Sequence, residues 1–399
     1  MSTVKKAGMG GMALMPILFG FFVMGFADLI GTFMENMGKD TTLVFPTMNV
    51  FGLSVSMVKF LPSMIFIWFF LVSVPAGMMT SRIGRKNTVL FSLAVTGVAM
   101  ILPFAVKHSV NAIYVSFVLL GIGNTIIQAA LPALVSNVTH PDKLASRLSL
   151  GQFVKAMCPA LTPWVLVMLS SWSDWRLLFP VYAGITLVAA VWLLMTPVPR
   201  EVSTAQTTTF GGCLALLGNP FILAMFSGIF FVVGVDVGFN CAIPSYLQNV
   251  FNLENGKIGT TVYFVAKFSG SFLGAFILAK YSPAKCFPIS ALLALAGTVA
   301  LFFVQGSLML TLSCFAVASL GISNIFGIVF GQAMNRVPDK ANEAAGLMVM
   351  AIAGGGIVAL LMGVLETAIG VGALVYVPMG CIVYLIGLGV FVAKHAKRA

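Results

Sequence analysis

Long apolar runs separated by short polar loops constrain this chain more than any other feature of its sequence. A helix needs about 20 mostly apolar residues to cross a bilayer. Twelve such runs lie at about 12–36, 55–79, 88–106, 110–137, 147–170, 177–196, 220–247, 257–280, 285–303, 307–334, 341–368 and 373–393. Only 8% of the residues are charged, whereas soluble domains carry about 25%. The pattern predicts an all-α polytopic membrane protein with twelve transmembrane helices.

Lysine and arginine are unevenly distributed between the two sides that alternating spans define. An even number of spans places both termini on one side, and that side holds 15 of the 22 basic residues against four on the other. Cytoplasmic loops carry such an excess, so we expect cytoplasmic termini. The net charge of +11 thus reflects membrane topology, and we expect no nucleic-acid partner. The three remaining lysines, Lys59, Lys155 and Lys267, fall within spans or at their edges.

Several other classes of protein find no support in the sequence. The six cysteines form no Cys-x-x-Cys pair and show no ligand-like spacing with the three histidines, so we expect neither disulfides nor a metal or other cofactor. An intramembrane enzyme would need a motif such as His-Glu-x-x-His or Gly-x-Ser-x-Gly, and the chain has neither. A sensory membrane protein should carry a sizeable soluble domain, and no loop is long enough to form one.

The two halves of the chain repeat each other at an offset of about two hundred residues. FFVMG before Asp28 is echoed by FFVVG before Asp236, GIGN by GISN, and one PDK triplet by another. We therefore expect an N-terminal six-helix bundle (1–196), a cytoplasmic linker (197–219) and a C-terminal six-helix bundle (220–399). Parallel repeats of this kind are typical of secondary transporters whose halves rock about a site at their interface.

The loop between the second and third spans reads GMMTSRIGRK, from Gly77 to Lys86. It resembles the G-x-x-x-D-R-x-G-R-[RK] signature of the major facilitator superfamily in the expected cytoplasmic loop. Gly77 and Gly84 permit close helix approach, and Arg82, Arg85 and Lys86 fix the topology and can latch the cytoplasmic face. The signature has aspartate where this chain has Ser81. The resemblance implies that this acid helps to latch the outward-facing state, so here the latch lacks its acid.

The resemblance also implies which helices form the site. The first, fourth, seventh and tenth line the cavity, and the fifth and eighth face each other between the halves. The mid-span polar residues of these six helices are therefore the candidates. Asp28 and Asp236 are the predicted proton-coupling residues. The predicted substrate-binding residues are Asn124, Gln128, Gln152, Lys155, Asn240, Tyr263, Lys267 and Asn324.

The spacing of these residues supports a shared site. Asn124 and Gln128 are four residues apart and so share one helix face, as do Asp236 with Asn240 and Tyr263 with Lys267. Amides suit sugars because each offers donors and an acceptor, and Tyr263 or Trp68 can stack on a pyranose. Interhelical hydrogen bonding is the alternative role for the amides.

The four charged candidates balance one another. A carboxylate at the bilayer centre costs roughly 2.5–3.5 kcal/mol, so it needs a cation, a wet cavity or a proton. The simplest pairing joins Asp28 to Lys155 and Asp236 to Lys267. Protonation of Asp28 would release its lysine, which is the two-state behaviour that coupling requires. Two static ion pairs that only hold helices together are the alternative.

Several stretches, among them FFVMGFADLIGT, LGQFVKA and GISNIFGIVFGQAMNR, are similar to the fucose–galactose–glucose:proton symporter family. The resemblance implies that the acid of the first span, Asp28 here, couples protons. Fucose permeases also use a glutamate in the fourth span, where this chain has Ile127. We therefore expect a monomeric transporter of the bacterial inner membrane that imports a monosaccharide, a hexose or deoxyhexose, by proton symport. Sodium is the alternative coupling ion.

Two other substrates compete with a neutral sugar. Lys155 and Lys267 would favour an acidic sugar such as a uronate. A drug:proton antiporter of the same fold is less well supported, because the fifth span lacks the G-x(8)-G-x3-G-P-x2-G-G signature of those antiporters and carries a lysine unsuited to cationic drugs.

Overall fold

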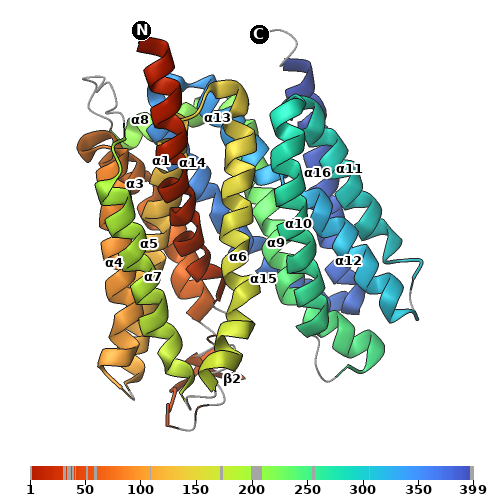
Figure 1. Ribbon diagram of the computed structural model, residues 1–399. Coiled ribbons are helices and arrows are strands. Elements are labelled where there is room, and N and C mark those ends of the chain that lie inside the picture. The colour runs from red at the N-terminus through yellow and green to blue at the C-terminus, as the bar shows by residue number, and fades with distance from the viewer. Residues whose placement is uncertain are drawn as a thin grey trace.

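The protein is a bundle of helices that run between two ends of the molecule, and both chain termini lie at the same end (Figure 1). The computed structural model describes residues 2–29, 33, 37, 40, 42–50, 53–57, 61–107, 109–170, 174–198, 209–253, 257–304 and 306–395. We call the end that carries the termini the terminus end and the other the opposite end. Lys59 and residues 199–208 of the predicted linker lie outside the described residues.

The first half of the chain contains six long helices and several short elements. These are α1 (Ser2–Met24), η1 (Gly25–Leu29), β1 (Thr47–Val50), β2 (Leu53–Ser56), α3 (Leu61–Ile83), α4 (Arg85–Ala105), α5 (Val110–Asn137), η3 (Pro141–Lys143), α6 (Leu144–Ser170), η4 (Trp175–Leu177) and α7 (Leu178–Met195). The two strands form an antiparallel hairpin that pairs Thr47 with Ser56 and Val50 with Leu53. The prediction that the second span begins near residue 55 is therefore wrong, because that segment pairs as a strand and the helix begins at Leu61.

The second half repeats this arrangement with two broken helices. Its elements are α8 (Phe210–Ala215), η5 (Leu216–Gly218), α9 (Pro220–Phe251), α10 (Lys257–Lys280), α11 (Pro283–Ala300), α12 (Leu308–Ile322), α13 (Ile325–Arg336), η6 (Pro338–Lys340), α14 (Ala341–Met350), η7 (Ala351–Ala353), α15 (Gly354–Ile369), η8 (Gly370–Gly372) and α16 (Ala373–His395). The start of α9 is fixed locally, because the Asn219 side chain accepts a hydrogen bond from the N–H of Phe221 at 2.9 Å and Pro220 occupies the first turn.

Each of the twelve predicted segments contains a helix. In the described part of the chain, ten helices are long and apolar enough to cross a membrane.

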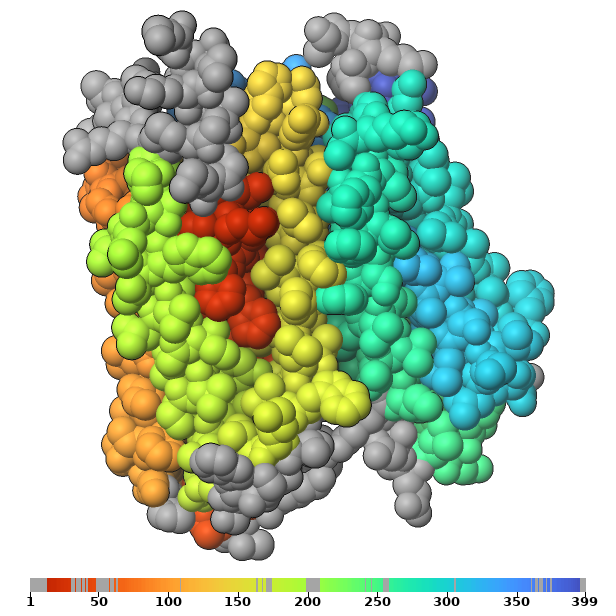
Figure 2. Space-filling view, in the orientation of Figure 1, coloured from red at the N-terminus to blue at the C-terminus, as the bar shows by residue number. Residues whose placement is uncertain are grey.

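The helices pack in the same way in each half. α1 packs on α6 as α9 packs on α15, α3 packs on α5 as α10 packs on α12, and α4 packs on α7 as α11 packs on α16. Between the halves, α6 packs on α10 and α3 packs on α14. Figure 2 shows α6 against α10 along this seam, with the first span recessed between α6 and α7. The packing agrees with the duplication seen in the sequence, whereas the exact domain limits stay a prediction.

The halves touch closely at the terminus end, through the loop that resembles the superfamily signature. A side chain at Gly77 would meet the Asn342 carbonyl oxygen at 2.8 Å, so glycine allows α3 to approach α14. Arg85 Nε donates to Asn342 Oδ1 at 2.7 Å, and Asn342 Nδ2 donates to Ser81 Oγ at 3.2 Å. The acid that the signature would place at residue 81 is absent, and the amide of Asn342 bridges serine and arginine instead.

The other predicted residues of this loop have separate roles. The prediction that Gly84 permits close helix approach is wrong, because no neighbouring atom lies within 4 Å of where its side chain would be. Gly84 instead forms the turn between α3 and α4 with a φ of 88°, which a side chain would disfavour. Lys86 Nζ donates to the carbonyl oxygens of Leu194 and Thr196 at 2.9 and 2.8 Å and so ties α4 to the end of α7. Arg82 is exposed. Two further bonds join the halves at the terminus end: Ser146 Oγ donates to Ala275 O at 2.6 Å, and Asn335 Nδ2 donates to Pro141 O at 3.2 Å.

An ion pair anchors the segment before the hairpin at the opposite end. Arg176 Nη2 and Trp175 Nε1 donate to Asp40 Oδ2 at 2.6 and 3.0 Å, and the Thr42 hydroxyl donates to Asp40 Oδ1 at 2.6 Å. Burial raises the pKa of Asp40, but the hydrogen bonds from Thr42, Trp175 and Arg176 outweigh it and lower the pKa from 3.8 to about 2.

This carboxylate should make stability depend on acid pH. Because the folded-state pKa is lowered, the contribution of Asp40 is complete above about pH 4 and is lost as the pH falls towards 2. We expect Asp40→Asn to lower the free energy of unfolding at pH 7 by about 1.5–3 kcal/mol, the range for hydrogen bonds to charged groups. Thermal unfolding of both proteins between pH 7 and 3 is the measurement. A constant difference across that range would contradict the assignment.

Candidate functional site

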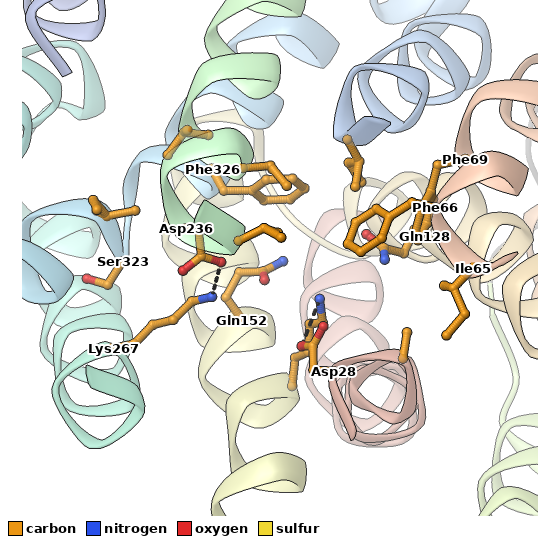
Figure 3. Close-up of a pocket in the computed structure, with 17 residues that line it drawn as sticks. Asp28, Ile65, Phe66, Phe69, Gln128, Gln152, Asp236, Lys267, Ser323 and Phe326 are labelled. Carbon is orange, nitrogen blue, oxygen red and sulfur yellow. Dashed lines mark hydrogen bonds and ion pairs between the residues drawn. The ribbon is translucent and has the colours of Figure 1, made fainter. Parts of the chain in front are cut away.

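A cavity lies between the two halves, bounded by segments from eight of the twelve spans. Its empty volume is about 730 Å³, including space open to the outside. The lining residues are Ala27, Asp28, Ile65, Phe66, Phe69, Gln128, Gln152, Lys155, Val232, Val233, Asp236, Val237, Lys267, Ile322, Ser323, Phe326 and Ile352 (Figure 3). Three irregular segments reach it: η1, the break between α12 and α13, and η7.

Asp28 enters the cavity from η1 and forms an ion pair with Lys155 of α6. The Lys155 Nζ lies 3.1 Å from Asp28 Oδ2, and the Asp28 side chain is 31% exposed. Gly25 makes this approach possible, because a side chain there would meet the Lys155 carbonyl oxygen at 2.5 Å. Among the described residues, Lys155 is the only ion-pair or hydrogen-bond partner of the Asp28 carboxylate.

Asp236 of α9 is held more tightly by two residues of α10. Lys267 Nζ donates to Asp236 Oδ2 at 2.5 Å, and the Tyr263 hydroxyl donates to Oδ1 at 2.9 Å. Tyr263 and Lys267 therefore share one helix face, as their spacing predicts. Both predicted ion pairs are present, and their two acids differ: each oxygen of Asp236 has a donor, whereas Asp28 has one partner.

Each ion pair lies within one half of the molecule. Asp28 and Lys155 belong to the first half, and Asp236 and Lys267 belong to the second. Because each pair is neutral, the four charges sum to zero in the cavity wall. The halves can therefore move relative to each other without separating either pair.

Among the described residues, no group of three His, Cys, Asp or Glu side chains can hold a metal ion.

Two amides add polar atoms to the wall. Gln152 of α6 lies between the two ion pairs (Figure 3) and has no hydrogen-bond partner among the described residues. Gln128 of α5 donates from Nε2 to Asn124 Oδ1 at 2.7 Å. Gln152 thus offers both its amide oxygen and its NH₂ group to a ligand, and Gln128 offers its amide oxygen.

The other four predicted substrate-binding residues lie outside the cavity wall. Asn124 is buried and donates from Nδ2 to the Met24 carbonyl oxygen at 2.8 Å. Tyr263 is buried behind Asp236, and Asn324 is buried at the α12–α13 break, where its Nδ2 donates to Gly270 O at 2.9 Å. Asn240 is half-buried on α9. Direct substrate contact by these four remains an expectation from the sequence, and the geometry gives three of them interhelical bonds.

The sequence reasoning missed the aromatic part of the wall. Phe66 and Phe69 of α3 and Phe326 of α13 line the cavity, whereas Trp68 packs against Gly121 on another face of α3. The α3 helix is the second span, which the resemblance does not place among the lining helices. In an apolar helix nothing distinguishes a phenylalanine that faces a cavity from one that faces lipid, so the sequence carried no signal for them.

Known proteins resemble this chain in sequence and in architecture. The sequence model of the Major Facilitator Superfamily matches residues 17–360. The glucose/galactose transporter of Brucella abortus biovar 1 (strain 9-941) is 24% identical over 379 residues, which cover 89% of this chain and 88% of the relative. The E. coli fucose:proton symporter FucP in its outward conformation has a similar fold, with a TM-score of 0.81, 17% identity and coverage of 95% of this chain and 98% of FucP. The proton:xylose symporter XylE gives a TM-score of 0.75 at 13% identity, with coverage of 98% and 96%.

The second ion pair gives a direct test of charge balance. We expect Lys267→Met to destabilise the protein by about 3–5 kcal/mol, because Asp236 is left as an uncompensated charge. The double variant Lys267→Met/Asp236→Asn should recover most of that loss, since both groups are then neutral. Thermal unfolding of the two purified variants measures the difference. Equal losses in both would show that the pair does not balance charge.

Proposed function

The chain belongs to the major facilitator superfamily, and on that premise we propose that it imports a neutral monosaccharide together with a proton. The two halves alternate access to the cavity by rocking about their seam. The name of the Brucella relative, a glucose/galactose transporter, supports a hexose. The two symporters of similar fold, for fucose and for xylose, support proton coupling to a sugar.

The observation that carries the proposal is the charge-balanced cavity wall with free amide groups. A sugar needs donors and acceptors around its hydroxyls, and Gln152 and the oxygen of Gln128 provide them. Its less polar ring faces suit aromatic side chains, and Phe66, Phe69 and Phe326 line the same space. The cavity is built from one chain, so we propose a monomer as the working unit.

The pairing of the lysines favours a neutral sugar over a uronate. Lys155 and Lys267 would attract a carboxylate if they were unpaired, but each lies within 3.1 Å of an aspartate oxygen. Binding a uronate would add a net negative charge to a neutral, partly buried site, which is unfavourable.

Asp28 is the proton carrier in this proposal. It is the less constrained acid, with one partner and with access to the cavity. When Asp28 is protonated the ion pair is lost, and Lys155 becomes available to a sugar oxygen. Asp236 keeps its two donors and holds α9 to α10.

We also propose that the terminus end faces the cytoplasm and that the protein lies in the bacterial inner membrane. The excess of basic residues on that side supports this orientation. The hydrogen bonds through Asn342 and Ser146 then close the cytoplasmic end of the transporter. Closure of the cytoplasmic end is what an outward-facing transporter requires, so we propose that the structure represents that state.

Asp28→Asn separates proton coupling from sugar binding. We expect this variant to lose uphill uptake driven by a pH gradient but to retain sugar counterflow, which needs no net proton movement. Uptake and counterflow in proteoliposomes are the measurements. Loss of both activities would mean that Asp28 has a structural role, and uphill uptake driven by a sodium gradient would identify sodium as the coupling ion.

Ligand-dependent stability tests the charge of the substrate. A neutral hexose at about 100 times its Kd should stabilise the purified protein by about 2.7 kcal/mol, whereas the corresponding uronate should have little effect. A thermal-shift series with glucose, galactose, fucose, glucuronate and galacturonate makes the comparison. Greater stabilisation by a uronate would overturn the neutral-sugar proposal.

A further inference from the structure

A short chain of hydrogen bonds runs from the cavity wall to the backbone beside Asp28. Gln128, a cavity-lining residue only 5% exposed, donates from Nε2 to Asn124 Oδ1 at 2.7 Å. Asn124 in turn donates from Nδ2 to the carbonyl oxygen of Met24 at 2.8 Å. Met24 is the last residue of α1, and the turn that carries Asp28 begins at the next residue.

The Met24 carbonyl fixes the direction in which the hydrogen bonds of this series donate. A backbone carbonyl only accepts hydrogen bonds, so Asn124 must present its NH₂ group to Met24. The oxygen of Asn124 then faces Gln128, which must also present its NH₂ group. The oxygen of Gln128 is left for the cavity, where a sugar hydroxyl can donate to it.

The Met24 carbonyl lies where the helix changes its winding. In a continuous α-helix it would accept from the N–H of Asp28, four residues later. The chain instead continues as the 3₁₀ segment η1, Gly25–Leu29. A 3₁₀ helix turns about 120° per residue and an α-helix about 100°, so over four residues the two forms point Asp28 in directions about 80° apart. In the 3₁₀ form the Met24 carbonyl accepts from the N–H of Ala27 instead. Its second lone pair accepts from the Asn124 amide, which ties the junction between α1 and η1 to α5.

We propose that Asn124 is a positioning residue that couples sugar binding at Gln128 to protonation of Asp28, through the Met24 carbonyl and η1. The inference rests on the proposed function. Neighbouring sugar hydroxyls engage both groups of the Gln128 amide and withdraw its NH₂ from Asn124. Asn124 then loosens from Met24, the released junction between α1 and η1 changes its winding, and Asp28 turns away from Lys155. A carboxylate that has lost its cation takes up a proton.

The same steps run in reverse, as linkage requires. A proton on Asp28 abolishes the ion pair with Lys155, frees η1, and makes the Gln128 amide available to sugar. Sugar should therefore bind more tightly at acid pH than at alkaline pH. The coupling is positive, which is the sign that symport needs.

Several titratable groups surround Asp28, and none of them is part of the relay. Lys155 and Cys158 face it from α6, and Tyr182 of α7 packs on the neighbouring Phe26. Across the cavity lie Asp236 and Lys267, which are bonded to each other. Among the three residues of the relay, α5 contributes two amides and α1 a backbone carbonyl, so the relay adds no titrating group of its own.

Calorimetric titration of the full-length protein with D-glucose and D-galactose, at acid and at alkaline pH, tests the inference. For each sugar, the measured quantity is the ratio of the Kd at alkaline pH to the Kd at acid pH. We expect Asn124→Leu to reduce this ratio by about tenfold, within the range of roughly 2- to 30-fold for changes along a coupling network. Gln128→Met removes the other end of the relay and should reduce the ratio similarly, which keeps the test available if Asn124→Leu does not fold.

Ser116→Ala is the matched control. Ser116 lies on the same helix, is buried, and donates to the Ala99 carbonyl oxygen of a neighbouring helix at 2.5 Å. The Ser116→Ala variant therefore loses one interhelical hydrogen bond to a backbone carbonyl, as Asn124→Leu does. It should leave the ratio of the Kd values at the two pH values unchanged. If both relay variants bind sugar with the native pH dependence, the inference is overturned and the proposed function stands. The proposed function itself fails if the native protein binds neither sugar, or if it binds each sugar with the same Kd at all pH values.

Discussion

The rest of this structure depends on the neutralisation of charge inside each half of the molecule. Two acids and two lysines stand at mid-height in an apolar bundle, where an isolated charge is costly. Asp28 pairs with Lys155, and Asp236 pairs with Lys267, each within its own half. A pair that bridged the halves would have to break whenever they rocked, at a cost of several kcal/mol. Pairing within a half leaves the seam free to open and close.

Small residues place these charges. Gly25 brings η1 against α6, so that Asp28 reaches Lys155, and Gly77 brings α3 against α14 at the terminus end. At that end the bridging group is Asn342, an amide that donates to Ser81 and accepts from Arg85. The contact between the halves thus survives the loss of the signature acid, because one amide supplies both the donor and the acceptor.

The sequence predicted the fold well because hydropathy, basic-residue bias and the internal repeat all act over many residues. It predicted both ion pairs because charges are conspicuous in apolar helices and must be balanced. It did not predict the hairpin at Thr47–Ser56, since the apolar residues there also suit a span. Nor did it separate Gln128, which lines the cavity, from Asn124, which lies behind it. Four-residue spacing places two side chains on one face of a helix but says nothing of their depth.

The two halves have diverged from a common plan in a way that suits a coupled transporter. The second half clamps its acid: Asp236 lies on a continuous helix, and Tyr263 and Lys267 bind both its oxygens. The first half leaves its acid on a 3₁₀ turn with one cation, at a helix end held by the side chain of Asn124. A proton site has to change its surroundings during the cycle, and a scaffold must not. Duplication supplied two copies of one helix, and under the proposed function the difference in their windings favours Asp28 for the changing role and Asp236 for the constant one.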